Sequence, residues 1–209
     1  MRIKCLKLYV CKTFVYFAYY YLHRQLIMTF SDKCNRIFRN VCLDYHKHDD
    51  VNACLQNPYT RLTIEYSLYK KCWIDTVKCH LEEIICNSEI EPITALYISK
   101  RIDKLNQDSV DLIELIDAYF REKYKHVKVA TDTTINYQSP ASIINRLSIL
   151  ALKIYHTQQK VECINATAGH IQKSKAKLDV LLEQRITLSS EIDTLLNDLE
   201  EGHKYMKDV

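Results

Sequence analysis

Glycine scarcity constrains the fold of this chain more than any other feature of its sequence. Only two glycines, Gly169 and Gly202, occur in 209 residues. β-rich folds need many positions where the backbone turns left-handed, and phosphate-binding loops need glycine where the backbone approaches the ligand. The chain is therefore predicted to be all-α, and neither a GxGxxG loop nor a Walker-type loop can be written in it.

Apolar residues recur at steps of three and four, which predicts a multi-helix bundle of about five helices with a long C-terminal helical hairpin. The expected helices cover residues 31–46, 62–86, 92–124, 141–161 and 167–201, and residues 125–138 form a surface connection. The second helix has one apolar face, with polar residues opposite it at Lys71, Asp75, Lys78 and Glu82. The fourth has two apolar faces, typical of a helix packed between partners. The last is close to a heptad pattern, interrupted by Arg185.

Helix-boundary signals support these ranges. Ser31 and Ser139 are placed to cap the first and fourth helices, and Pro92 and Pro140 suit the first turn of the third and fourth.

Residues 1–27 differ in composition from the rest of the chain. They contain five basic and no acidic residues, and a tyrosine-rich apolar run at 14–22. The run is about half the roughly 20 residues that a bilayer requires, and no small-residue cleavage site follows it. We expect a non-domain leader over 1–27, either a mis-assigned start before Met28 or a weak signal-like segment, and a single helical domain over 28–209. No stable membrane insertion is expected.

The formal charge of +3 comes from this leader, because the rest of the chain holds slightly more acidic than basic residues. Charges interspersed along helices provide no electrostatic footprint for DNA or RNA. Nucleic acid is therefore not an expected partner.

The stretch CWIDTVKCHLEEIIC, residues 72–86, raises the question of a metal site. Seven helical residues advance about 10 Å, so Cys72, Cys79 and Cys86 cannot share one zinc ion or form a disulfide. They are predicted to be small buried apolar side chains. Nine cysteines without a CxxC motif indicate free thiols in a reducing, cytoplasmic compartment. The chain also lacks the two Glu-x-x-His pairs that a di-iron bundle requires, so neither a metal nor a cofactor is expected.

Polar residues that border the apolar seams offer a candidate catalytic set. His80 can serve as a general base, with Glu83 or Asp103 as its orienting carboxylate and Arg146 as an anion clamp. The full candidate set is His80, Glu83, Asp103, Asn106, Arg146 and His156. Each also has an ordinary structural interpretation as a solvated edge or an interhelical hydrogen bond.

Three stretches resemble the bacterial domain-of-unknown-function 4254 family, in particular its Bacteroidetes-type members. They are HLEEII at 80–85, RIDKLNQDSVDLIELID at 101–117, and the segment from Asn136 through Pro140 to His156. The resemblance covers most of positions 28–205 and implies a helical protein of unestablished activity. It also suggests a loose link to cell-envelope glycan biosynthesis.

Two functions of different classes follow. The first is a scaffold, adaptor or accessory protein, with a protein partner or a second copy bound through the C-terminal helix. The alternative is an enzyme or small-ligand-binding protein with a polar interhelical pocket around His80, Asp103 and Arg146.

Overall fold

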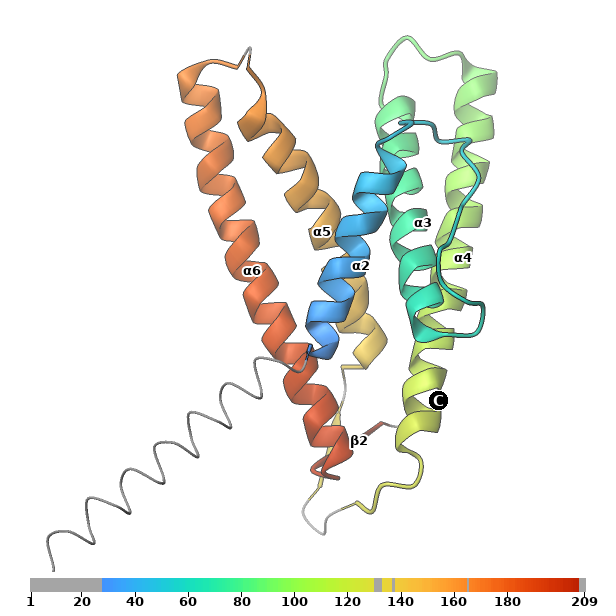
Figure 1. The fold of residues 1–209 in the computed structure, drawn as a ribbon. Helices are drawn as coiled ribbons and strands as arrows, with labels where there is room; N and C mark the ends of the chain where they lie inside the picture. Colours follow the sequence, from blue (N-terminus) through green and yellow to red (C-terminus); the bar gives the residue numbers. More distant parts are fainter. Residues whose placement is uncertain (1–27, 130–132, 137, 165, 207–209) are drawn as a thin grey trace, which may run out of the picture. The chain divides into compact units, whose positions relative to one another are not determined.

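A computed structural model describes residues 28–129, 133–136, 138–164 and 166–206 (Figure 1). The described residues from Ser31 onward form one compact unit, which holds their hydrophobic core. The leader predicted over 1–27 lies outside the described residues.

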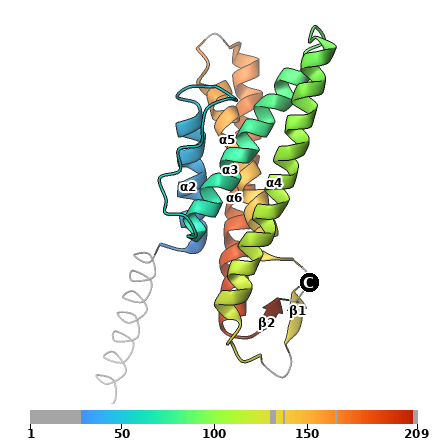
Figure 2. The ribbon, with the colours of Figure 1, turned by 90° about the vertical axis from the view of Figure 1, so that its right-hand side faces the viewer.

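Five α-helices form the framework of the described part of the chain. They are α2 Phe30–Tyr45, α3 Ile64–Ile85, α4 Pro92–Tyr124, α5 Pro140–Glu162 and α6 Ala168–Glu200. α5 packs closely against α6, and α3 packs against α4 (Figures 1 and 2). The all-α bundle with a long C-terminal hairpin is therefore confirmed.

The helix starts follow the predicted capping chemistry, with one exception. The Ser139 side chain accepts a hydrogen bond from the backbone N–H of Ser142, and Pro140 occupies the first turn of α5. Ser31 lies inside α2 instead of capping it. Its hydroxyl and its backbone N–H both donate to the Asp193 carboxylate on α6, at 2.6 and 2.9 Å. Ser31 thus fixes α2 to the hairpin.

The predicted apolar seams form the core. On α4 the buried positions are Ile98, Ser109, Leu112, Ile116 and Phe120. α5 packs against α3, α4 and α6, as its two apolar faces predicted. Within the described residues, no helix has the length and apolar character needed to cross a bilayer.

The polar face predicted for α3 is wrong at two positions. Lys71 and Asp75 are buried, at 0% and 4% exposure, and they pair with each other. α3 is covered on several sides, because Cys72 contacts the Phe38 carbonyl on α2 and Ser148 on α5 donates to Asp75. A single-helix pattern shows the strongest apolar face but does not show how many neighbours enclose the helix.

The cysteines of α3 match the prediction only in part. Cys72 is buried and Cys79 half-buried, but Cys86, which follows the last helical residue, is exposed. All seven described cysteines are free thiols, as predicted.

The segment predicted as a surface connection contains a short strand. β1, Thr134–Asn136, pairs in parallel with β2, Lys204–Met206, and Thr134 lies opposite Lys204. This two-stranded pairing joins the connection before α5 to the end of α6 (Figure 2).

Candidate metal centre

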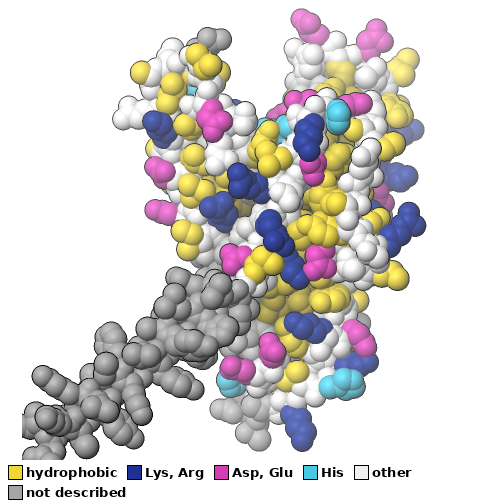
Figure 3. Space-filling model, in the orientation of Figure 1, with side chains coloured by type: hydrophobic (Ala, Val, Ile, Leu, Met, Phe, Trp, Pro, Cys, Tyr) yellow, Lys and Arg dark blue, Asp and Glu magenta, His cyan; other side chains and the backbone are white. Residues whose placement is uncertain are grey.

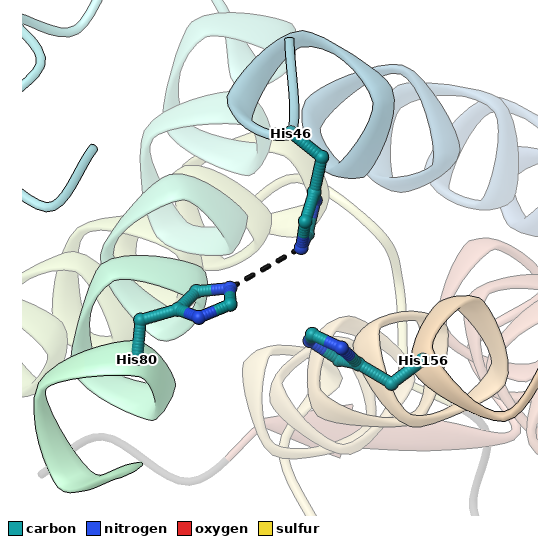
Figure 4. Close-up of side chains that lie close together, drawn as sticks. All are labelled: His46, His80 and His156. Atoms are coloured by element: carbon teal, nitrogen blue, oxygen red, sulfur yellow. Dashed lines mark hydrogen bonds between the residues drawn. The ribbon is translucent and has the colours of Figure 1, made fainter. Parts of the chain in front are cut away.

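Three histidines from three different helical segments converge in the bundle. His46 follows the last residue of α2, His80 lies near the end of α3, and His156 lies in the second half of α5. Each offers one ring nitrogen, and these three atoms all lie within 4.8 Å of one another. Figure 4 shows the three rings turned toward a common centre.

His46 is held by the end of α2. Its Nδ1 lies 2.6 Å from the backbone carbonyl of Cys42, in the last turn of the helix. A carbonyl oxygen only accepts, so Nδ1 must carry the proton and donate. In the neutral ring the Nε2 atom therefore presents a lone pair toward the centre of the cluster.

His80 is held in a similar way by a carboxylate. Its Nδ1 lies 3.3 Å from Glu83 Oε2, one turn further along α3. Its ring stacks on Tyr45, with the ring centroids 4.9 Å apart and the planes 14° from parallel. When Nδ1 carries the proton and faces Glu83, the Nε2 atom of the neutral ring also directs a lone pair inward.

These two inward nitrogens face each other. His46 Nε2 and His80 Nε2 are 3.2 Å apart (Figure 4). When both rings carry their proton on Nδ1, two lone pairs meet at this distance, and a shared proton or a bound cation relieves their repulsion. The contact therefore indicates a site for a positively charged species.

His156 adds a third ring to the pair. Its Nε2 is buried and has no hydrogen-bond partner within the described residues. A buried polar atom without a partner is costly, and one reason for its presence is a bound species that satisfies it. His156 therefore extends the histidine pair into a three-membered set.

Burial keeps two of these rings neutral. Removal from water lowers the pKa of His46 and of His156 from the ordinary value of 6.5. Any positive charge on the neighbouring histidines lowers the pKa of His156 further. Neutral imidazole is the form that binds metal ions.

Carboxylates lie at the exposed rim of the cluster. Asp49 Oδ1 is 3.9 Å from His46 Nε2, and the side chains of Asp49 and Glu83 are 66% and 63% exposed. Their negative charge favours a cation at the centre, at a distance where water screens it only in part.

The donor set suits one transition-metal ion. Zinc–nitrogen bonds of about 2.0–2.1 Å at tetrahedral angles place ligand nitrogens roughly 3.4 Å apart. The facing nitrogens of His46 and His80, 3.2 Å apart, are already near this value. Nitrogens as far apart as 4.8 Å would have to approach by about 1.4 Å to reach this value.

The structure brings together only part of the set predicted from the sequence. His80, Glu83 and His156 lie in the cluster. Asn106 is exposed and instead accepts a hydrogen bond from Lys78 at 3.2 Å. Arg146 pairs with Glu191 of α6 at 3.6 Å and lies ten residues from His156, about 15 Å along α5. Asp103 is exposed on α4.

His46 is the residue that the sequence prediction missed. It is the last residue of the first expected helix, 31–46, it begins the polar stretch HKHDD at 46–50, and it was not among the predicted site residues. A histidine directly after a helix end, followed by acidic residues, was the available signal.

The sequence matches the family described as "Protein of unknown function (DUF4254)" over residues 65–208. This range includes His80 and His156, whereas His46 precedes it. No curated protein and no solved structure matches the chain.

Proposed function

This chain belongs to the DUF4254 family, and we propose that it binds one divalent transition-metal ion through His46, His80 and His156 and uses the ion to activate water. The observation that carries the proposal is the contact between the Nε2 atoms of His46 and His80. His46 Nδ1 donates to the Cys42 carbonyl and His80 Nδ1 faces Glu83, an arrangement that directs both Nε2 atoms toward one shared cation.

The polar groups behind the rings are typical of those behind metal ligands. A ligating histidine usually donates its other N–H to a carbonyl or carboxylate, which fixes the ring and raises the basicity of the ligating nitrogen. Cys42 supplies such a carbonyl to His46, and Glu83 such a carboxylate to His80. Two of the three rings are therefore pre-oriented for an ion.

Three nitrogen ligands favour zinc and leave a coordination position for water. Structural zinc sites use four protein ligands, whereas catalytic sites use three and keep the fourth position open. His80 is 19% exposed, so solvent reaches the cluster. A zinc ion held by these three histidines would lower the pKa of a bound water to about 7.

The carboxylates near the histidines have separate roles in this proposal. Glu83 is a positioning residue, because it holds the His80 ring through Nδ1. Asp49 lies on the ligand side of His46 and can accept the proton that the activated water releases. Hydrolysis is the reaction class that this arrangement suits.

The scaffold or adaptor function expected from the sequence, with a partner on the C-terminal helix, stays a prediction. So does the suggested link to cell-envelope glycan biosynthesis. Three converging histidines support the ligand-binding alternative, although its centre is His46, His80 and His156 instead of His80, Asp103 and Arg146.

Metal titration tests the proposal directly. The full chain is stripped with a chelator and titrated with Zn²⁺ and with Co²⁺, whose visible spectrum reports coordination by nitrogen. We expect one ion per chain. Loss of a group that only orients a metal ligand lowers metal affinity roughly 10- to 100-fold. Replacing His46, His80 or His156 by alanine removes a ligand itself and should lower metal affinity by more than this.

His126→Ala is the matched control, because His126 is exposed beyond the end of α4. Binding that survives in the three cluster variants, or that falls equally in His126→Ala, would contradict the proposal. If no ion binds and the His46 and His80 rings share a proton instead, NMR titration of the imidazole nitrogens will show it.

A further inference from the structure

A groove of about 940 Å³ runs between α2, α5 and α6, beside the histidine cluster. The α2 wall includes Asn35 and Arg39, the α5 wall Tyr155 and Gln158, and α6 contributes Arg185. A volume of this size suits a small-molecule ligand.

Three guanidinium groups line the groove, against two carboxylates, Asp32 and Glu162. Arg36 and Arg39 are exposed on α2, and Arg185 is half-buried on α6. Figure 3 shows Lys and Arg side chains gathered over α2 and toward α6. Arg185 is the residue that interrupts the heptad pattern of the last helix, and its place in the groove wall accounts for the interruption.

The guanidinium groups are available for a ligand. In the described part of the chain none of the three forms an ion pair, whereas Arg146, outside the groove, pairs with Glu191. Ser189 and Asn35 join α6 to α2 through a 2.9 Å hydrogen bond at the groove wall, which keeps the two arginine-bearing helices together.

The groove is continuous with the histidine cluster. Tyr155 lines the groove, and its ring lies 4.2 Å from that of His46 between centroids. Cys42 also lines it, and the Cys42 carbonyl is the acceptor for His46 Nδ1. A ligand in the groove therefore extends to the edge of the proposed metal centre.

From these observations we infer that the groove binds a phosphate-bearing ligand through Arg36, Arg39 and Arg185 and presents it to the histidine cluster. Guanidinium groups match phosphate oxygens with paired N–H donors, and a phosphate carries close to two negative charges at neutral pH. This inference rests on the proposed metal function in one respect only, namely that the bound ligand is a substrate. Binding of the phosphate depends on the arginines and does not require the metal ion.

Inorganic pyrophosphate is the probe, titrated into the full metal-free chain by calorimetry at fixed ionic strength. Arg36→Ala, Arg39→Ala and Arg185→Ala should each weaken binding roughly tenfold or more, the loss expected for one charged hydrogen-bonding partner. Arg61→Ala is the control, because it removes one positive charge from an exposed connection outside the groove. Arg185→Lys separates charge from geometry, since lysine keeps the charge but loses the paired donors.

A second variant distinguishes this inference from the metal proposal. His156→Ala should lose metal binding but keep pyrophosphate affinity within about twofold. Retained pyrophosphate binding with no metal binding in the wild type would sink the metal proposal and leave the groove assignment standing. No pyrophosphate binding, equal weakening in Arg61→Ala, or loss only in His156→Ala would overturn the groove assignment.

Discussion

Lys71 places its ammonium nitrogen 2.6 Å from both carboxylate oxygens of Asp75, one turn along α3 and shielded from solvent. Ser148 of α5 donates a third hydrogen bond to the same carboxylate, at 2.5 Å. The carboxylate therefore joins α3 to α5, the two helices that carry His80 and His156.

Removing the Asp75 carboxylate should destabilise the fold strongly. Asp75→Ala leaves a buried, unpaired ammonium group, and loss of one partner of a buried pair costs about 3–5 kcal/mol. The double variant Lys71→Met/Asp75→Ala should recover part of this loss, because no unpaired charge remains. Urea unfolding measures both. In the control Lys47→Met, which breaks an exposed pair with Asp44, the change should stay below about 1 kcal/mol. Equal losses in the single and double variants would contradict this account.

The helices were predictable because their signals are local. Apolar spacing and the Ser139-Pro140 cap depend on neighbours along the chain, and α4 and α5 begin and end close to the expected residues. The burial of Lys71 was not predictable in this way, because it depends on which other helices cover α3.

The site was only half predictable for the same reason. His80 and Glu83 lie one turn apart on one helix, so their pairing follows from spacing. His46 is 34 residues from His80, and only the packing of α2 against the other helices brings their rings together. No sequence spacing encodes that approach.

Glu83 should affect metal affinity without being a ligand. Glu83→Ala removes the acceptor behind His80, and we expect zinc affinity to fall by roughly 10- to 100-fold. The control is Glu82→Ala, which removes an equally charged, exposed neighbour, whereas the carboxylate paired with His80 is that of Glu83. Zinc titration of both variants provides the measurement. A similar loss of zinc affinity in both variants would show that Glu83 acts only through its negative charge and does not orient His80.

The metal-free protein should lose stability in mild acid. His46 and His156 have folded-state pKa values below the ordinary 6.5, so the unfolded chain binds their protons more readily than the folded chain. Stability should therefore be complete above about pH 7.5 and fall as the pH drops through about 6.5. The charges of Asp49 and Glu83 oppose the shift in His46, while Lys160 adds to that of His156.

Unfolding by urea at pH 7.5, 6.5 and 5.5 in chelator tests this dependence. The double variant His46→Gln/His156→Gln should show a flatter profile than the wild type across this range. Parallel profiles would show that other groups cause the acid sensitivity.

The two glycines should respond in opposite ways to alanine. Gly202 follows the end of α6 with φ of +75°, and an added Cβ would collide with the Lys128 carbonyl oxygen. A non-glycine residue in the left-handed conformation costs about 1–2 kcal/mol. With the collision added, Gly202→Ala should lower the free energy of unfolding by more than this. Gly169 lies in the first turn of α6 with no atom within 4 Å of an added Cβ, so Gly169→Ala should be neutral or stabilise by up to about 1 kcal/mol. Thermal unfolding compares the two variants, and equal losses would show that the turn into β2 does not require glycine.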